Sequence, residues 1–322
     1  MIQALKKKVI SLQNISHEEA MLLSQTAEKE KLYKAADEIR KHFCNDVFDL
    51  CSITNAKSGK CTQDCKWCSQ SMHHKCDIKE YEIIDCKQAV MKAVESAKQG
   101  VSRHSLVTSG RRVSNKTLDG LIPIYRKISE QSTIGLCASM GLITEEQMQR
   151  LKDEGNIGHY HCNIETAPSF FSSLVSTHTI DEKIETIKMA QKVGLKVCSG
   201  GIIGMGESME QRIEMAFTLR DLGIKSIPIN ILQPMKGTAL ENIAPLSEDE
   251  ILTTIAIFRF INPDAHLRFA GGRVQIKDFQ HKALRAGISA ALTGDYLTST
   301  GSNIQEDIQD FANAGFKIDH EQ

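Results

Sequence analysis

The chain has 322 residues, with 39 Lys and Arg against 40 Asp and Glu, so its formal net charge is −1. This balance provides no broad basic surface for nucleic acid or an anionic membrane. Hydrophobic residues make up 41% and charged residues 25%, which is usual for a globular protein, and no apolar run approaches the length of a membrane span. The N-terminus, Met1-Ile-Gln-Ala-Leu-Lys-Lys-Lys, lacks the apolar centre of a signal peptide, so a cytoplasmic location is expected. In that reducing compartment, ten cysteines indicate metal or redox chemistry rather than disulfides.

The first 46 residues are predicted to form helices. Ser16-His-Glu-Glu matches a capping box, and apolar residues follow it at helical spacing. From residue 47 a unit recurs that consists of a short β-branched run, a polar or glycine-bearing turn and an amphipathic helix. The predicted strands are 48–53, 103–108, 134–139, 160–165, 196–202, 226–232, 266–269 and 288–293. The predicted helices are 86–98, 117–129, 144–153, 180–193, 209–222, 247–260, 277–286 and 304–314.

Strands that alternate with helices in this way predict an α/β fold, a (β/α)8 TIM-type barrel with an N-terminal helical extension. The expected division is residues 1–46 for helices packed on the barrel and residues 47–322 for the barrel with its C-terminal segment. An open, doubly wound sheet is the structural alternative. It would normally carry a phosphate-binding loop after the first strand, where this chain has a cysteine-rich loop instead.

That loop reads Cys61-Thr-Gln-Asp-Cys65-Lys-Trp-Cys68, a CxxxCxxC spacing. Three thiolates on one short loop can hold three corners of a 4Fe–4S cluster and leave the fourth iron open. A closed zinc site wants four ligands, usually as two CxxC pairs, and no second CxxC occurs in the chain. Unliganded core cysteines are a poor alternative because charged and polar residues flank them. The loop therefore predicts a cluster with one open iron.

Polar and thiol side chains also recur inside the otherwise apolar predicted strands. They are Cys137, Asn163, Glu165, Cys198, Asn230 and Arg268. Any one of them could be a satisfied core group, but together with the cysteine loop they occupy six strands. Because the functional residues of a barrel gather at the C-terminal ends of its strands, this distribution favours one shared site.

The cysteine loop, with Trp67 as its aromatic residue, resembles the CxxxCxΦC loop of the radical S-adenosylmethionine (SAM) superfamily. The segment 200–207, Gly-Gly-Ile-Ile-Gly-Met-Gly-Glu, is similar to the superfamily's nucleotide-contact motif after the fifth strand. A closer resemblance, to the biotin synthase family, runs collinearly over roughly residues 40–300. Its motifs are residues 55–71, 162–166, 196–202, 227–230 and 267–273.

This resemblance implies a definite chemistry. The open iron would chelate SAM, and electron transfer would cleave SAM to methionine and a 5′-deoxyadenosyl radical. The radical would abstract hydrogen from dethiobiotin, and an auxiliary iron–sulfur cluster would give up the sulfur that closes the ring of biotin. An electron donor such as flavodoxin or ferredoxin and a homodimer are also implied. The interior of a closed barrel suits this chemistry, since other hydrogen donors would quench a primary carbon radical.

The resemblance also assigns residues to SAM. Contacts to the cofactor are expected from Trp67, Gly200, Ile202, Gly204 and Glu207. Lys183 stands where an arginine commonly meets the methionine carboxylate, and it keeps the charge without the bidentate fork. Asn163 and Glu165 would hydrogen-bond the SAM ribose or the substrate, with Glu165 in place of the family's aspartate. Strand alternation would put these two on one face and turn Cys162 toward the helices.

For the substrate, the resemblance implies that Asn230 holds the ureido ring, a planar group that a side-chain amide can pair with. Ser299 and Thr300 fall where the family anchors the substrate carboxylate. Two alternative functions would use some of the same cofactors. A biotin-synthase-like radical SAM enzyme could act on another small molecule, and a non-catalytic iron–sulfur protein would need a fourth thiolate on the first cluster.

The auxiliary cluster is where the sequence departs from the best-known members, which use three cysteines and an arginine around 2Fe–2S. Three of those positions are matched by Cys137, Cys198 and Arg268. The remaining cysteine position is Ser105, and a serine hydroxyl is a poor iron ligand. We hypothesise that Cys51 joins Cys137 and Cys198, that Cys44 is the fourth ligand and that Arg268 lies nearby. This set suits a four-iron cluster with an extra, transferable sulfide better than 2Fe–2S. Buried apolar thiols are the alternative for Cys44 and Cys51.

The remaining candidates receive no functional role. Cys76 and Cys86 lie beyond the cysteine loop, in a polar loop and at the start of a helix. The eleven histidines, including His73, His74 and His178, show no metal-ligand spacing and are expected at the surface.

Overall fold

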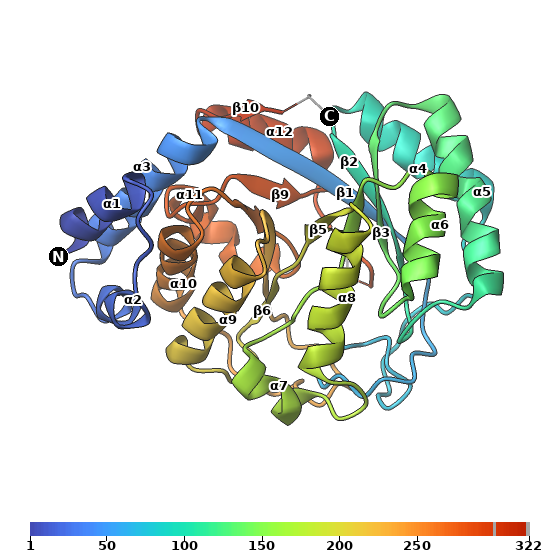
Figure 1. Ribbon diagram of the computed structural model, residues 1–322, viewed down its shortest axis with the longest axis horizontal. Helices are drawn as coiled ribbons and strands as arrows, with labels where there is room; N and C mark the ends of the chain where they lie inside the picture. The colour runs from blue at the N-terminus through green and yellow to red at the C-terminus, as the bar shows by residue number, and fades with distance from the viewer. Residues whose placement is uncertain (299–300, 320–322) are drawn as a thin grey trace.

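The computed structural model describes residues 1–298 and 301–319 (Figure 1). Parallel strands close into a barrel in the order β1-β2-β3-β4-β5-β7-β8-β9, and pairing of β1 with β9 completes the ring. The barrel strands are β1 Val47–Lys57, β2 Arg103–Thr108, β3 Gly135–Ser139, β4 His159–His161, β5 Lys196–Cys198, β7 Ser226–Ile231, β8 His266–Phe269 and β9 Ala290–Leu292. The predicted (β/α)8 barrel with its N-terminal helices is confirmed.

Two further strands extend this barrel at its two ends. β6, Gly201–Ile203, follows β5 and pairs with β7. β10, Lys317–Ile318, pairs with the first residues of β1, and in Figure 1 it lies beside the start of that strand. Phe48 of β1 stacks on Phe311 with ring centroids 4.2 Å apart. The end of the described chain therefore covers the N-terminal end of the barrel.

Helices surround the barrel (Figure 1). They are α1 Ile2–Ile10, α2 His17–Ser24, α3 Lys29–Cys44, α4 Cys86–Lys98, α5 Asn115–Gln131, α6 Glu145–Gly155, α7 Pro168–Leu174, α8 Ile180–Lys192, α9 Met209–Asp221, α10 Glu248–Ile261, α11 Gln280–Leu284 and α12 Ile304–Asn313, with the 3-10 helix η1 at Arg273–Phe279. Capping boxes begin several of them, including the predicted one at Ser16 and another at Ser247. α3 packs on α10, and the Tyr33 hydroxyl donates to Asp249 over 2.8 Å.

Several boundaries differ from the sequence prediction; for example, β1 is longer than the predicted strand 48–53, and α7 was not predicted. Three further differences lie near the pocket or after β8. β4 ends at His161 instead of reaching residue 165, and Glu165 itself takes a left-handed backbone conformation with φ of 70°. The predicted strand 196–202 divides into β5 and β6 around Gly200, where a Cβ atom would lie 2.0 Å from the carbonyl oxygen of Pro228. The predicted helix 277–286 is η1 followed by α11.

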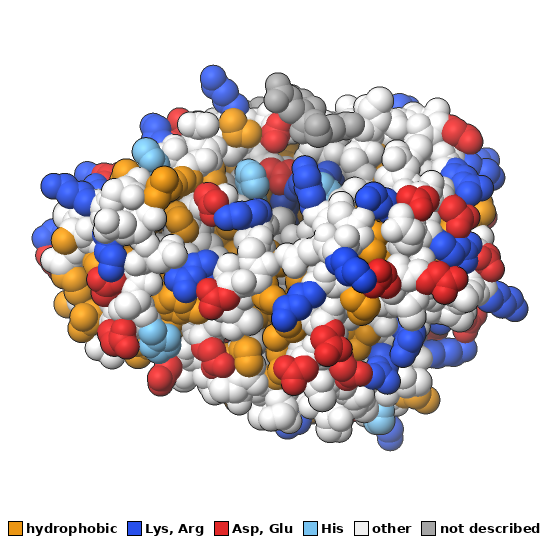
Figure 2. All heavy atoms as spheres, in the orientation of Figure 1, with side chains coloured by type: hydrophobic (Ala, Val, Ile, Leu, Met, Phe, Trp, Pro, Cys, Tyr) orange, Lys and Arg blue, Asp and Glu red, His pale blue; other side chains and the backbone are white. Residues whose placement is uncertain are grey.

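The charges on the visible surface are mixed, as the net charge of −1 leads us to expect. On the face seen in Figure 2, Lys and Arg side chains are interspersed with Asp and Glu side chains. In the described ranges, no helix is long and apolar enough to cross a membrane.

Candidate active site

A pocket of about 330 Å³ opens at the C-terminal end of the barrel strands. One wall is the connection after β1, with the thiols of Cys61, Cys65 and Cys68. The opposite wall comes from the barrel strands, with Cys51, Cys198, Arg268 and Asn230, and from the segment after β4, with Asn163. The fold thus brings the three-cysteine loop and the strand residues to one site, at the end of the barrel where enzymes of this fold bind their substrates.

The cysteine loop is tied to the segment that follows α7. The carboxylate of Asp64 accepts hydrogen bonds from the backbone of Ser176 over 3.0 Å and from the Thr177 hydroxyl over 2.9 Å. Gln63 and His178 share a buried hydrogen bond of 2.9 Å. Burial would raise the pKa of Asp64, but these donors outweigh it and hold that pKa well below its usual range. Sequence reasoning missed this clamp, although the acidic residue inside the loop was a signal for it.

Two of the loop thiols, Cys65 and Cys68, are protonated near neutral pH. Burial, with the neighbouring Cys61 thiol, raises the pKa of Cys68 to about 11, and burial likewise raises that of Cys65. A metal must therefore displace protons from these thiols. Among the described residues, no three His, Cys, Asp or Glu side chains converge closely enough to hold a single metal ion. A four-iron cube binds each thiolate through a different iron, so three cysteines spread over one loop fit a cube better than zinc.

Asn163, Glu165 and Lys183 meet beside the loop. The Lys183 ammonium donates to the carbonyl oxygen of Asn163 over 3.0 Å and lies 3.6 Å from the Glu165 carboxylate. Burial would lower the pKa of Lys183, but the Glu165 carboxylate outweighs burial and raises it, so the lysine keeps its charge. The predicted alternation along β4 was the wrong reason for this pairing, since the strand has already ended. Cys162 is buried with its thiol toward the backbone of Lys183 in α8, as expected of a core thiol.

The glycine-rich segment after β5 builds a turn. The carboxylate of Glu207 accepts hydrogen bonds of 2.7 Å from the backbone of Gly204 and Met205 and one of 2.7 Å from Arg212. Glu207 therefore shapes its own turn, and its contact with a cofactor stays a prediction. Gly200 donates its backbone N–H to Asn163 over 3.2 Å. Ile202 and Trp67 belong to one apolar cluster against Phe171 and Leu174, so the structure brings these two predicted residues together.

Asn230 lies on the pocket wall with its amide already oriented. Its Nδ2 donates to Gly201 over 3.0 Å, and its Oδ1 accepts from the backbone of Gly271 over 2.8 Å. The two predicted anchors of the substrate carboxylate, Ser299 and Thr300, lie outside the described residues.

Deeper in the barrel, Cys51, Cys137, Cys198 and Arg268 come from β1, β3, β5 and β8. These are alternate strands of the ring, which is how one layer of side chains fills a barrel of this type. Arg268 Nη1 donates to the sulfur of Cys51 over 3.3 Å, and the Ser226 hydroxyl donates to that of Cys198 over 3.3 Å. Burial raises the pKa of Cys51 and Cys137. The structure thus brings together three of the four cysteines of the auxiliary hypothesis.

A carboxylate on the N-terminal side of Arg268 keeps this arginine positively charged. Arg268 forms a buried ion pair with Asp49, which also binds Arg103. Burial would raise the pKa of Asp49, but both arginines outweigh it and hold that pKa well below its usual range. Two buried polar atoms beside the thiols, Arg268 Nε and the Ser105 hydroxyl, have no hydrogen-bond partner among the described residues. Three thiols next to unpartnered donors fit an iron–sulfur cluster with its sulfides as acceptors.

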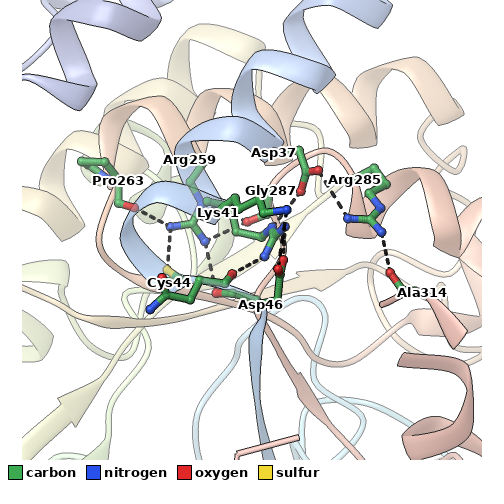
Figure 3. Close-up of polar contacts among 12 residues, drawn as sticks. Asp37, Lys41, Cys44, Asp46, Arg259, Pro263, Arg285, Gly287 and Ala314 are labelled. Carbon is green, nitrogen blue, oxygen red and sulfur yellow. Dashed lines mark hydrogen bonds and ion pairs between the residues drawn. The ribbon is translucent and has the colours of Figure 1, made fainter. Parts of the chain in front are cut away.

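Cys44 is not part of this group. Its sulfur lies at the end of α3, 3.7 Å from Arg259 Nη1 and 3.8 Å from the carbonyl oxygen of Ala265 (Figure 3). Arg259 is fully buried and donates to the carbonyl groups of Pro263, Ala265 and Gly287. Because Ala265 precedes β8, this network lies at the N-terminal end of the barrel, away from the pocket. The prediction that Cys44 is a ligand is wrong.

The expectation that the histidines lie at the surface is also wrong for several of them. His104 and His178 are buried, and His161 lines the pocket. Burial, together with His159 and Arg103, lowers the pKa of His161 to about 3, so this imidazole is neutral near pH 7. Sequence reasoning missed His161 because a single histidine in a short strand carries no spacing signal.

Comparison with known proteins agrees with this site. A family model described as the Radical SAM superfamily matches residues 56–219, and one described as the Biotin and Thiamin Synthesis associated domain matches residues 228–317. A biotin synthase of Porphyromonas gingivalis is 51% identical over 99% of this chain and 96% of its own length. One of Parabacteroides distasonis is 50% identical over 98% of this chain and 97% of its own length.

Solved structures show the same fold at low identity. Methylornithine synthase superposes with a TM-score of 0.81 at 18% identity, over 98% of this chain and 97% of its own. A maturase of FeFe-hydrogenase from Carboxydothermus hydrogenoformans superposes with a TM-score of 0.83 at 16% identity, over 100% of this chain and 80% of its own. The barrel, the cysteine loop and the family models define a radical SAM protein. Within that superfamily, the chain belongs to the biotin synthase family.

Proposed function

We propose that this enzyme forms biotin by SAM-dependent radical insertion of sulfur into dethiobiotin. The observation that carries the proposal is one pocket lined both by the three-cysteine loop and by Cys51, Cys198 and Arg268. Family membership makes the chain a radical SAM enzyme that inserts sulfur and implies a 4Fe–4S cluster and SAM. When bound, the first cluster supplies the electron that cleaves SAM, and the auxiliary cluster supplies the sulfur.

Cys61, Cys65 and Cys68 hold the first cluster in this proposal. Lys183 faces the SAM carboxylate, since its charge is retained and one side of its ammonium is already oriented by Asn163. Glu165 balances that charge and accepts hydrogen bonds from the ribose. Trp67 and Ile202 give the cofactor an apolar wall. The cluster loop, fixed by its contacts to residues 174–178, shields the radical from water.

Dethiobiotin lies between SAM and the deeper cysteines. Asn230 pairs with its ureido ring, because both the donor and the acceptor side of the amide are fixed by backbone groups. Asn163 contributes a second polar contact, and Ser299 and Thr300 anchor the carboxylate. This order places the substrate carbons between the two clusters, as hydrogen abstraction on one side and sulfur insertion on the other require.

The auxiliary cluster is held by Cys51, Cys137 and Cys198. Arg268 stays protonated beside Asp49, so it has no lone pair to offer iron and acts as a cation and hydrogen-bond donor beside the thiolates. Three thiolates without a fourth protein ligand favour a four-iron cluster that carries an extra sulfide. Mössbauer spectra with iron and sulfide counts test this, and a 2Fe–2S species at this site would overturn it.

The partners follow from the same chemistry. A small electron carrier such as flavodoxin or ferredoxin reduces the first cluster, and the enzyme works as a homodimer in the cytoplasm, where its ten free thiols stay reduced. Gel filtration and chemical cross-linking test the homodimer.

The function itself is tested by incubating the anaerobically reconstituted protein with SAM, a reductant and dethiobiotin. We expect biotin and 5′-deoxyadenosine to form together. 5′-Deoxyadenosine without biotin would indicate another substrate, and neither product would contradict radical SAM activity.

A further inference from the structure

β4 carries two inward-facing histidines, one on either side of the auxiliary cysteines. In the strand register, His159 pairs with Cys137, and His161 pairs with Cys198. His161 lies two residues closer to the pocket and lines it. His159 lies nearer the N-terminal end of the barrel, on the side away from the pocket. It faces Arg103, with 3.4 Å between His159 Nε2 and Arg103 Nη1. β4 therefore places one imidazole on the pocket side of the thiols and one on the side toward the N-terminal end of the barrel.

Ser105 occupies the matching place on β2. It pairs with Cys137 on one side and with Ile53 on the other, and Ile53 is the pocket-lining residue two positions beyond Cys51. Since alternate residues of a strand share a face, Ser105 points inward like Arg103, which contacts Asp49 inside the barrel. Ser105 and His161 thus flank β3 and Cys137 from the two neighbouring strands, both on the pocket side.

The polar side chains on the N-terminal side of the thiols already have hydrogen-bond or ion-pair partners, whereas Ser105 and His161 do not. Arg103 binds Asp49, and Ser226 donates to Cys198. By contrast, Ser105 is 1% exposed, and within residues 1–298 and 301–319 neither its hydroxyl nor the imidazole of His161 has a hydrogen-bond partner. A buried hydroxyl without a partner costs roughly 1–3 kcal/mol, so it is expected to meet an acceptor in the working protein.

We propose that Ser105 and His161 hold the transferable sulfide of the auxiliary cluster by donating hydrogen bonds to it from the pocket side. The proposal rests on the four-iron cluster of the proposed function. The thiols of Cys51, Cys137 and Cys198 occupy three directions around the centre of the barrel, and Arg268 with Asp49 closes a fourth. The free direction is the one toward the pocket and the substrate, between the Ser105 hydroxyl and the imidazole of His161.

This arrangement gives Ser105 a function as serine. A hydroxyl is a poor iron ligand, but it is a good donor to a sulfide, and the neutral imidazole of His161 has one N–H to give. Together they would fix the sulfide on the side from which the substrate carbon approaches. Both are positioning residues, since they act on the cluster and not on the substrate.

The test uses full-length protein in which Cys61, Cys65 and Cys68 are replaced by alanine, so that only the auxiliary cluster is counted. In this background we compare Ser105→Ala, His161→Leu and the double variant by iron and acid-labile sulfide analysis and by Mössbauer spectroscopy. We expect all three to retain their iron, and we expect the double variant to lose about one sulfide per cluster. Ser105→Ala combined with His161→Gln, which keeps one N–H donor, should retain the sulfide.

His159→Leu is the matched control, because it removes the imidazole of the same strand on the side away from the pocket and should leave the sulfide count unchanged. A double variant with the parent sulfide-to-iron ratio and unchanged Mössbauer spectrum would overturn the proposal. Loss of all iron from the single variants, with folding intact by circular dichroism, would also overturn it by indicating a ligand role. The parent protein separately reports on the proposed function, since a 2Fe–2S spectrum there would remove the four-iron cluster itself.

Discussion

Cys44 and Cys51 both lie beside a buried arginine, yet only one of them belongs to a group of thiols. Cys51 has Arg268 at 3.3 Å and shares its barrel layer with Cys137 and Cys198. In the part of the chain that the structure describes, the hydrogen-bond partners of the Cys44 sulfur are Arg259 at 3.7 Å and the carbonyl oxygen of Ala265 at 3.8 Å. An arginine next to a thiol therefore does not identify a cluster ligand. The further thiols across the barrel are what make Cys51 a candidate ligand.

Alanine at these two positions should have opposite effects. Cys51→Ala removes one of the three proposed ligands, so we expect the auxiliary cluster to be lost and biotin formation to cease, while 5′-deoxyadenosine is still produced. Cys44→Ala should leave the iron content and the Mössbauer spectrum unchanged, at a stability cost of about 1–3 kcal/mol for the lost packing. Iron analysis of both variants after the same reconstitution makes the comparison. Loss of the auxiliary cluster from Cys44→Ala would return that residue to the ligand set.

The thiols of the cysteine loop should be slow nucleophiles before a metal binds. With its pKa near 11, Cys68 has far less thiolate at pH 8 than an ordinary cysteine. In the metal-free protein we expect its alkylation by iodoacetamide to be on the order of a hundredfold slower than that of free cysteine. The rate should rise about tenfold per pH unit up to pH 10. Mass spectrometry of timed samples measures it, and a rate that does not change with pH would mean that access limits the reaction.

At the level of elements, the cysteine loop depends on the segment that follows α7, Pro168–Leu174. The backbone of Lys66 donates to Leu174 over 3.2 Å, and Asp64 collects hydrogen bonds from Ser176 and Thr177. The loop that carries Cys61, Cys65 and Cys68 is thus fixed by residues more than a hundred positions later. This explains how a long connection can hold three thiols in place without secondary structure of its own.

Asp64→Ala should loosen the first cluster selectively. The loss of several hydrogen bonds to a charged carboxylate is expected to cost about 1.5–3 kcal/mol at a partly exposed site, reduced by solvent screening. We expect the variant to lose its 4Fe–4S iron during gel filtration while its auxiliary iron stays. Asp77→Ala, at an exposed position of the same connection, is the matched control. Equal iron retention in the two variants would show that the clamp does not support the cluster.

The sequence was sufficient for the elements that depend on local pattern. β2 and α4 were predicted with their observed bounds, because apolar periodicity and a cap define them locally. β4 and β5 were predicted too long, since their ends are set by contacts with other strands, such as the approach of Gly200 to Pro228. His161 and the Asp64 clamp could not be predicted, because each acquires its role from a strand or loop far along the chain.

For the whole molecule, the barrel combines an open end with a closed end. The pocket lies at the C-terminal end, where the loops carry the cluster cysteines. The other end is closed by β10, by the network of Arg259 and by the ion pairs of Asp49 with Arg103 and Arg268. Since Asp49 lies in β1 and the two arginines lie in β2 and β8, this one carboxylate joins strands on both sides of the seam where the barrel closes.

Asp49→Asn should therefore weaken the whole barrel and do so in a pH-dependent way. The amide leaves Arg268 buried without its counter-charge, which is expected to cost about 3–5 kcal/mol near pH 7. The pKa of Asp49 in the folded chain lies below the ordinary value of about 3.9, so its stabilisation is complete above that value and is lost as the pH falls below it. The difference in the free energy of unfolding between wild type and variant should thus be largest above about pH 5 and shrink toward pH 3. Urea unfolding of the metal-free proteins across this range measures the difference. A difference that does not change with pH would mean that the charge of Asp49 contributes nothing and that the variant acts through packing alone.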